Sequence, residues 1–373
     1  MVIDSPHAYR LRGLQQGHDP ELLRRAVAEA DRVEGRGLTS VLTLKHLAHQ
    51  TGATYIYLRE IVQRKRDPYT EILRSRANGR PMRLISAPDP VLMSVQRWIL
   101  ENIVGRLTVH PASAAYGKGN SVAACARRHV GASWLVKMDV HNFFHSIDER
   151  AIYKIFQNVG YSSLVAFELS RICTRPVPGS PHIHPVRRDR VIESYSTANL
   201  GILPQGAPTS GVLANISFFA CDEILSSLAE SCGLVYTRYA DDIVFSAGES
   251  FTRRDADALI EIARDALLAH GLTPHRGKTQ VVPPGGRHIV LGLLVDGDRV
   301  RLTREFRQRV QTHIRGVENF GLATHRRHRK FASTAGLINH VNGLLAFAFD
   351  VDPAWAGEIR AHWASILAAQ MNR

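Results

Sequence analysis

Two adjacent acids, Asp241 and Asp242, lie in the stretch YTRYADDIVF that runs from Tyr236 to Phe245. Apolar residues flank them on both sides, which predicts two strands joined by a tight turn that carries the acids. A core strand ordinarily excludes such a pair, because burying carboxylates is unfavourable unless a counter-ion is present. Two divalent cations would supply that charge. For this stretch alone, a turn that faces solvent is the alternative interpretation.

Asp139 is a third acid with similar neighbours. It ends the stretch WLVKMD, which predicts a strand that is buried except at Lys137, and the aromatic pair Phe143 and Phe144 follows. If this strand lies beside the Asp241 turn, three carboxylates converge. Such a set can hold two metal ions about 4 Å apart, which clamp the attacking hydroxyl and the leaving pyrophosphate in nucleotidyl transfer. Catalysis would then rest mainly on positioning and charge neutralisation.

A third candidate element is the stretch LPQGAPTSG, from Leu203 to Gly211. Gly206 allows the backbone to approach a ligand closely, and Pro208 stiffens the start of a helix. Together these features suit contact with a base pair.

The order of D-V-x-N-F-F, L-P-Q-G-A-P-T-S and Y-A-D-D along the chain resembles motifs A, B and C of reverse transcriptases. Upstream, the stretches RLISAPD at 83–89, QRWIL at 96–100 and HPASAAYGKGNS at 110–121 resemble the fingers of bacterial retron enzymes. The resemblance covers residues 35–350 or so. The chain departs from the retron pattern at two positions: Cys125 replaces the Asn of Asn-Ala-x-x-His, and Leu291 replaces the Thr of Val-Thr-Gly.

The resemblance implies catalytic roles for residues of these motifs. Asp139, Asp241 and Asp242 would be the catalytic carboxylates and, with the Val140 carbonyl, would bind two Mg²⁺ ions, for which Mn²⁺ could substitute. Lys278, in the stretch RGKT, resembles the lysine of motif D and would protonate the leaving pyrophosphate. The alternative is that Lys278 is an exposed loop lysine.

Nucleotide binding is implied in the same way. Phe144 stands where the family places its steric gate, which excludes a ribose 2′-hydroxyl and so predicts a preference for deoxynucleotides. The triphosphate would be held by arginines, whose forked guanidinium groups suit phosphate. Gln205 and Gly206 of motif B would line the nascent base pair. The nucleotide-binding residues implied are Arg76, Arg80, Arg83, Phe144, Gln205 and Gly206.

The charge of the chain favours a nucleic-acid partner over a merely basic soluble protein. Lys and Arg number 47 against 34 Asp and Glu, a formal +13, and residues 298–373 hold 12 Lys and Arg against 6 Asp and Glu. A solvated face is the alternative for the basic cluster in this tail. Leu291 and Gly292 resemble the primer grip. The expected nucleic-acid contacts are Lys118, Arg127, Arg128, His129, Leu291, Gly292, Arg326, Arg327, Arg329 and Lys330.

The resemblance also implies partners. We expect a structured non-coding RNA as template and primer, deoxynucleotides as substrates, RNA-linked single-stranded DNA as product, a role in anti-phage defence and an effector protein. A defence reverse transcriptase without retron RNA and a non-catalytic RNA-binding scaffold are the alternatives. No apolar leader and no apolar run near 18 residues is visible, and the four cysteines form no C-x-x-C pair. These features predict a cytoplasmic protein that does not enter the membrane, and the resemblance implies that it is bacterial.

The fold class expected is α+β: a right-hand polymerase with fingers and palm made of an antiparallel sheet plus helices, and a helical thumb. The expected division is an N-terminal helical region (1–66), fingers and palm (67–297) and thumb (298–373). Hydrophobic periodicity predicts the elements within it. These are helices at 20–33, 92–107, 213–228 and 252–270, hairpins at 234–246 and 288–303, strands and turns at 68–90, and helices throughout 304–373.

Three further segments carry specific expectations. Ser146 and Glu149 predict a capping box that opens a helix ending at Gly160. Residues 44–62 predict two short helices, favoured as a plain hairpin over a helix-turn-helix that enters DNA and would make the chain a DNA-binding regulator. Residues 174–200 predict a surface excursion. His182 and His184 are candidate metal ligands there, but no further ligand supports them and a solvated loop is favoured.

Overall fold

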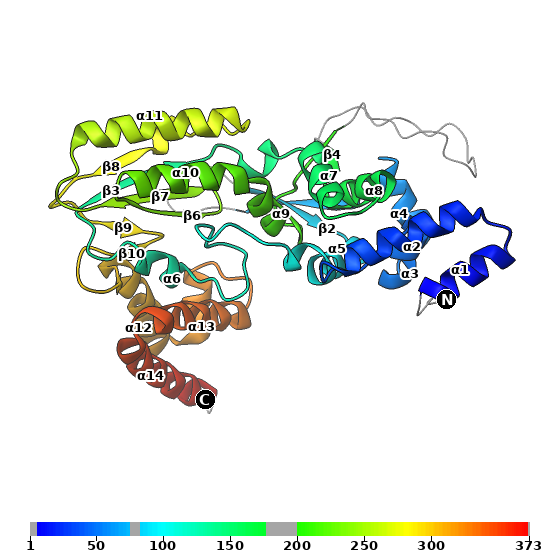
Figure 1. The fold of residues 1–373 in the computed structure, drawn as a ribbon. Helices are drawn as coiled ribbons and strands as arrows, with labels where there is room; N and C mark the ends of the chain where they lie inside the picture. Colours follow the sequence, from blue (N-terminus) through cyan, green and yellow to red (C-terminus); the bar gives the residue numbers. More distant parts are fainter. Residues whose placement is uncertain (1–5, 75–82, 177–199, 372–373) are drawn as a thin grey trace.

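Figure 1 shows the protein as a computed structural model that describes residues 6–74, 83–176 and 200–371. At its centre lies a four-stranded antiparallel sheet with the strand order β6-β7-β3-β8. Successive residues of β3 face opposite sides, so Val136 and Met138 enter one hydrophobic core and Leu135 enters a second. The strands are β3 (Trp134–Asp139), β6 (Val235–Tyr239), β7 (Asp242–Ala247) and β8 (Gln280–Val282).

Two helices, α10 (Phe219–Ser231) and α11 (Arg253–Ala269), cover one face of this sheet (Figure 1). In α11 the buried residues Leu259, Ala263 and Leu267 recur every fourth position, which places them on one face of the helix. This face packs on the sheet and closes the larger core.

The opposite face of the sheet packs against a small second sheet. There Leu135 and Val244 join Val290 and Leu293 in the smaller core. The hairpin expected at 288–303 is three strands, because β10 pairs with both of its neighbours. The expected boundary at 297/298 therefore falls inside one sheet. Its strands are β9 (Ile289–Val290), β10 (Leu293–Leu294) and β11 (Arg301–Leu302), and α6 (Val122–Arg127) packs nearby.

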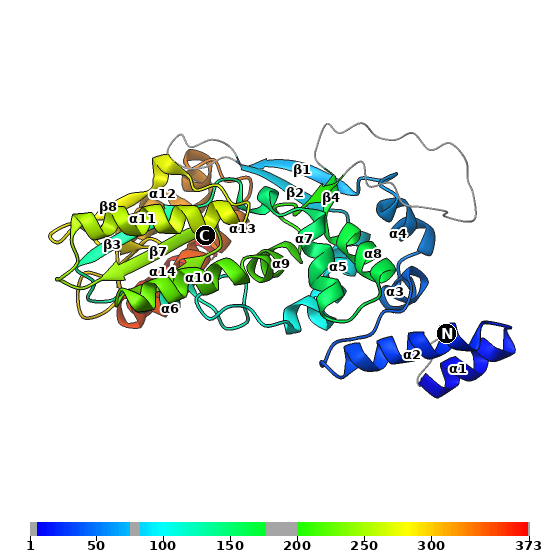
Figure 2. The same ribbon diagram turned by 45° about the horizontal axis from the view of Figure 1, so that its top comes forward.

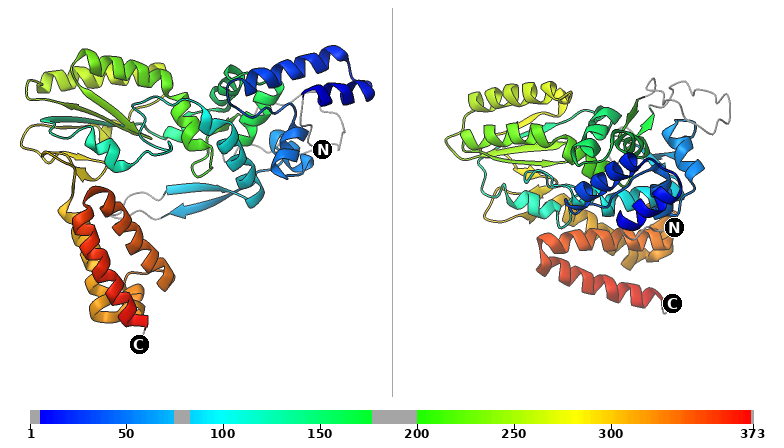
Figure 3. Two further views of the ribbon diagram at one scale, coloured as in Figure 1. Left: turned by 60° about the horizontal axis from the view of Figure 1, so that its bottom comes forward. Right: turned by 45° about the vertical axis from the view of Figure 1, so that its right-hand side comes forward.

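Three C-terminal helices form a bundle that stands out from the rest of the molecule (Figure 3): α12 (Arg304–His328), α13 (Thr334–Val351) and α14 (Pro353–Met371). The first of them is interrupted at Gly321, where φ is 77° and ψ is 162°. As a result His313 Nδ1 and His325 Nε2 lie 3.1 Å apart. A continuous helix would separate these positions by about 18 Å, so the chain doubles back on itself at Gly321.

A two-stranded hairpin, β1 (Tyr69–Arg74) and β2 (Arg83–Pro88), extends from the N-terminal half toward the C-terminal bundle (Figures 2 and 3). The helix that follows, α5 (Pro90–Asn102), begins with a proline and is capped by Asp89, whose carboxylate accepts from the Leu92 N–H at 2.9 Å.

The N-terminal helices pack against the larger core. The buried residues Leu47 and Leu58 of the segment at 44–62 belong to this core, and α4 contacts α8. The segment is therefore a plain helical hairpin packed on its neighbours, as favoured from the sequence. The N-terminal helices are α1 (Pro6–Gln15), α2 (Pro20–Glu34), α3 (Leu44–Thr51) and α4 (Tyr55–Val62). The neighbouring helices from the middle of the chain are α7 (Glu149–Asn158) and α8 (Ser163–Cys173).

Two predicted details are wrong. Asp148, not Ser146, caps α7: its carboxylate accepts from the Arg150 and Ala151 backbone N–H groups. Ser146 instead ends the 3₁₀ turn η2 (Phe143–Ser146), and its hydroxyl donates to the His141 carbonyl. The helix expected at 213–228 is two helices, α9 (Ser210–Ser217) and α10, which bend by 55°.

Arg76, Arg80, His182 and His184 lie outside the described residues. Within the described ranges, no single helix is both long and apolar enough to cross a membrane, and only the bent pair α9 and α10 passes that test jointly.

Candidate active site

The three predicted acids meet at one end of the central sheet. Asp139, the last residue of β3, is the register partner of Asp242, the first residue of β7. The Val140 N–H donates to the Asp241 carbonyl at 3.1 Å, which ties the end of β3 to the β6–β7 turn. This turn is tight because Tyr239 pairs with Asp242, and Ala240 within it has a φ of 56°. Acids separated by about a hundred positions are thus neighbours.

Clustering of the three charges shows in the pKa of Asp242, which is raised to about 6. Desolvation by the surrounding protein is the largest cause, and the charges of Asp241 and Asp139 add to it. Lys278 and Lys137 act in the opposite direction. Asp242 keeps one side open to solvent, so an incoming cation can reach it.

Lys278 supplies the positive charge nearest to Asp139. Its Nζ lies 2.8 Å from both carboxylate oxygens. The backbone fixes this arrangement, because the His275 N–H donates to the Asp139 carbonyl at 2.7 Å and Lys278 closes the 3₁₀ turn η3 (Arg276–Lys278). The Asp139 side chain is 10% exposed and the Lys278 side chain 50% exposed. The lysine thus reaches from solvent onto a nearly buried acid.

The donor set suits a hard divalent cation, since it consists of carboxylate oxygens and backbone carbonyls. In the described part of the chain, however, no three acidic, histidine or cysteine side chains lie together in an arrangement that could hold a metal ion. Both oxygens of Asp139 are engaged by Lys278. A cation held by Asp139 would therefore have to replace or share this lysine contact.

A fully buried arginine supports the acidic turn from beneath. Arg238, three residues before Asp241, donates to both Asp222 oxygens at 2.9 and 2.6 Å. Its Nη1 also donates to the Asn215 side chain at 3.0 Å and to the Ala240 carbonyl at 3.1 Å. These bonds link α9, α10 and the turn. Sequence reasoning missed them, although an arginine within an otherwise apolar strand was a usable signal.

Phe144 lies five positions after Asp139, in η2. It is half-buried and contacts Phe143 and Tyr116, with ring centroids 5.4 and 6.1 Å away. Phe143 is buried and packs on Phe218. The second aromatic residue of the pair is therefore partly accessible to solvent, while the first is buried in the core.

Gly206 lies close to the β1–β2 hairpin. A Cβ there would lie 2.7 Å from Ile85 Cγ2 and 2.9 Å from the Ser86 carbonyl oxygen of β2. Its φ of 125° also favours glycine. The Ser86 N–H donates to the Gln205 carbonyl at 2.8 Å. Gln205 and Gly206 thus dock the β1–β2 hairpin. Arg83 begins β2 at this junction.

His129 cannot make the nucleic-acid contact expected of it, because it is only 1% exposed. Its ring nitrogens share hydrogen bonds with the Ser246 and Thr237 hydroxyls at 2.7 and 2.6 Å. This burial lowers its pKa to about 4, helped by the charge of Arg128. His129 is therefore a neutral packing residue behind the sheet.

The other expected nucleic-acid residues lie at or near the surface. Leu291 and Gly292 form the tip of the β9–β10 turn, with φ of 50° and 84°. Arg127 donates to the Asp350 carbonyl of α13 at 2.7 Å, and Arg128 donates to the Pro111 carbonyl at 3.3 Å. Arg326 is half-buried, whereas Lys118, Arg327, Arg329 and Lys330 are exposed.

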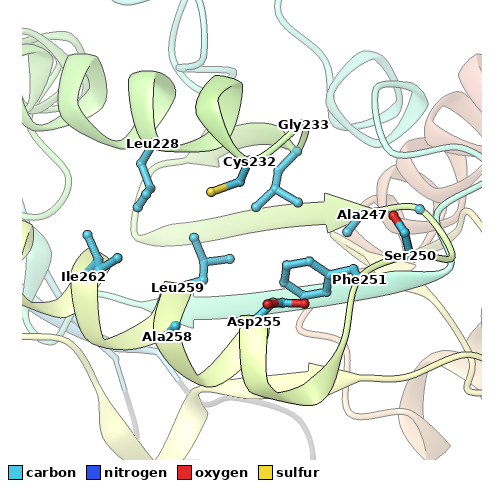
Figure 4. A pocket seen from close by; sticks show the side chains of 12 residues that line it. Leu228, Cys232, Gly233, Ala247, Ser250, Phe251, Asp255, Ala258, Leu259 and Ile262 are labelled. Carbon is cyan, nitrogen blue, oxygen red and sulfur yellow. The ribbon is translucent and has the colours of Figure 1, made fainter.

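A separate groove of about 360 Å³ lies between α10 and α11 (Figure 4). Leu228, Ala247, Phe251, Leu259 and Ile262 contribute to its apolar lining. Because Ala247 ends the strand that Asp242 begins, the groove lies at the far end of β7 from the acids. It does not belong to the acidic site.

Comparison with known proteins agrees with this geometry. Residues 76–313 match the family described as reverse transcriptase (RNA-dependent DNA polymerase). The chain is 30% identical over 275 residues to the retron Ec86 reverse transcriptase of Escherichia coli, which covers 73% of this chain and 72% of that protein. It is also 30% identical over 340 residues to the retron Mx162 reverse transcriptase of Myxococcus xanthus, which covers 87% and 67%. The chain therefore belongs to the retron reverse transcriptases and is an RNA-directed DNA polymerase.

Proposed function

We propose that the chain adds deoxynucleotides to a primer hydroxyl by a two-metal mechanism centred on Asp139, Asp241 and Asp242. The observation that carries this proposal is the register pairing of Asp139 with Asp242 beside the Asp241 turn. A pair of Mg²⁺ ions, or Mn²⁺ in their place, would supply Lewis-acid stabilisation of the attacking and leaving oxygens. The Val140 carbonyl would be a further ligand.

Lys278 would act twice in this scheme. In the free protein its ammonium neutralises Asp139. Once a cation takes over that role, the ammonium, which lies at the site and is half exposed, would be available to donate a proton to the departing pyrophosphate. This accounts for a lysine that is both close to the acid and reachable from solvent.

The remaining site residues would bind nucleotide and nucleic acid. Phe144 would exclude a 2′-hydroxyl, Gln205 and Gly206 would lie against the nascent base pair, and Arg83, with Arg76 or Arg80, would hold the triphosphate. The positions of Gln205 and Gly206 against β2 support this, because they bring the start of β2 close to motif B. Duplex contacts would be made by Lys118, Arg127, Arg128, Leu291, Gly292 and the basic group of Arg326, Arg327, Arg329 and Lys330.

Regions 1–66, 67–297 and 298–373 would serve as N-terminal helical region, fingers and palm, and thumb. The RNA partner would be a structured non-coding RNA, and the product would be RNA-linked single-stranded DNA that serves anti-phage defence together with an effector protein. The names of the relatives as retron reverse transcriptases support an assignment of this kind. The free thiols of all four cysteines fit a bacterial cytoplasmic setting.

The test is primer extension by purified full-length protein with poly(rA), oligo(dT), Mg²⁺ and dTTP. We expect extension by the wild type, its loss in Asp241→Ala, and its retention in the control Asp265→Ala, an exposed acid on α11. A wild type that binds the primer–template without extending it would favour the alternative of a non-catalytic scaffold.

The RNA partner is tested separately, by sequencing the nucleic acid that co-purifies with the protein. Covalently joined RNA and DNA, each removable by its own nuclease, are expected. DNA without linked RNA would instead favour a defence reverse transcriptase that lacks a retron RNA.

A further inference from the structure

Tyr116 occupies a strained turn beside the candidate steric gate. The Gly117 N–H donates to the Ala115 carbonyl at 2.8 Å, which closes a three-residue turn with Tyr116 at its centre. The φ of Tyr116 is 59°, a region that residues other than glycine rarely adopt. Strained backbone of this kind persists only where the surroundings enforce it, and it concentrates at functional sites.

The surroundings do enforce it. The Asn215 side chain of α9 donates to the Ala115 carbonyl at 2.7 Å. The Ala114 N–H donates to the Arg238 carbonyl of β6 at 2.8 Å. The turn is therefore attached both to the motif B helix and to the strand that leads to the acids.

This turn presents the Tyr116 ring to two neighbours. One is Phe144, which it meets edge to face with ring centroids 6.1 Å apart. The other is Gly211, at the start of α9, where a Cβ would lie 2.5 Å from Tyr116 Cγ. The ring is thus seated on a position without a side chain, yet Tyr116 remains 50% exposed. An exposed aromatic ring held so closely is suited to contact a ligand.

We propose that Tyr116 is a specificity-determining residue that forms, with Phe144, a two-ring wall against the sugar of the incoming nucleotide. The Phe144 ring contacts both Phe143 and Tyr116. An apolar pocket that is merely the right size rejects an added hydroxyl by only about 100-fold. Stronger rejection of a 2′-hydroxyl requires that the Phe144 ring does not move aside, and its contact with Tyr116 would hold it in place. This inference rests on the proposed polymerase function and deepens it.

The test measures kcat/KM for dUTP and for UTP, which differ only in the 2′-hydroxyl, on poly(rA)–oligo(dT) with Mg²⁺. We expect Tyr116→Ala to lower the dUTP/UTP ratio by about tenfold and Tyr116→Phe to keep the wild-type ratio, because the ring remains. Gly211→Ala should lower the ratio like Tyr116→Ala, since the new methyl group displaces the ring. The double variant should be no worse than Tyr116→Ala alone, because the two changes act on one ring.

Gly343→Ala is the matched control, since this glycine of α13 has open space where a Cβ would lie. It should leave the ratio unchanged. A wild-type ratio in Tyr116→Ala, with a lowered ratio in Phe144→Val, would overturn the inference but leave the polymerase assignment intact. An unchanged ratio in Phe144→Val would overturn it as well, because Phe144 would then not be the gate. Only a wild type unable to extend with dTTP would sink the proposed function itself.

Discussion

Lys278 Nζ lies 2.8 Å from both carboxylate oxygens of Asp139, a residue 139 positions away in the chain. An ammonium group thus neutralises a nearly buried acid of the candidate active site. Under the proposed two-metal mechanism the same oxygens would have to serve a divalent cation. Lysine and metal ion would then compete for Asp139, and several consequences can be measured.

Removing the lysine should separate its two roles. In Lys278→Ala we expect kcat to fall by about 100-fold through loss of the proton donor. The Mg²⁺ concentration for half-maximal activity should also fall, because nothing competes for Asp139. Magnesium titrations of primer extension would measure both, with Lys154→Ala of the exposed α7 surface as control. A higher magnesium requirement would mean that Lys278 holds Asp139 in readiness for the metal ion.

Neutralising Asp242 should stabilise the metal-free protein while abolishing activity. Its folded pKa of about 6 lies above the ordinary value of 3.8, so the folded state holds more protons between these values and loses stability as pH rises through them. Asp242→Asn should therefore raise the Tm in EDTA at pH 7 and flatten its pH dependence between 4 and 6. Asp139→Asn should raise the Tm by less, because it also removes the ion pair with Lys278.

Adding Mg²⁺ should raise the Tm of the wild type and leave that of Asp242→Asn nearly unchanged, because ligands that bind only the folded state stabilise it. Thermal unfolding with and without the ion provides the measurement. Equal magnesium stabilisation of both proteins would show that Asp242 is not a metal ligand.

Breaking the support beneath the acidic turn should affect folding and catalysis differently. Asp222→Ala leaves the fully buried Arg238 guanidinium without its carboxylate partner. This change should lower the free energy of unfolding by about 3–5 kcal/mol. The double variant Arg238→Met with Asp222→Leu should recover part of this stability, because the guanidinium is gone although the buried Tyr236 hydroxyl loses its acceptor. Its kcat should remain low, because the Ala240 carbonyl has lost its donor. Urea unfolding and primer extension would separate the effects, and wild-type kcat in the double variant would contradict the role assigned to Arg238.

His129 should make stability sensitive to mild acid. Its folded pKa of about 4 lies below the ordinary 6.5, so the unfolded state takes up the proton first as pH falls. The contribution of the buried neutral imidazole to the free energy of unfolding is complete above pH 6.5. It is lost progressively as the pH falls toward 4, by about 3 kcal/mol in all. His129→Gln should be less stable at pH 7 but show a flatter profile across this window. A profile as steep as that of the wild type would place the titrating group elsewhere.

Three strands of the central sheet and their acids were predictable, because a short apolar run and an acid at a strand end are local patterns; β8 was not predicted. What escaped prediction were the long-range partners. The acceptor of Lys278, the strand against which Gly206 packs and the carboxylate that pairs with Arg238 lie far away in sequence. Local competition explains the capping error, because Ser146 and Asp148 both suit an N-cap and only the path of η2 decides between them.

The reversal of α12 at Gly321 determines how far the basic residues of this helix lie from the central sheet. Because the chain turns there, the cations at Arg326, Arg327 and Arg329 lie back alongside the first half of the helix instead of beyond its end. A single residue without a side chain thereby keeps these positive charges nearer to the sheet than a straight helix of the same length would place them.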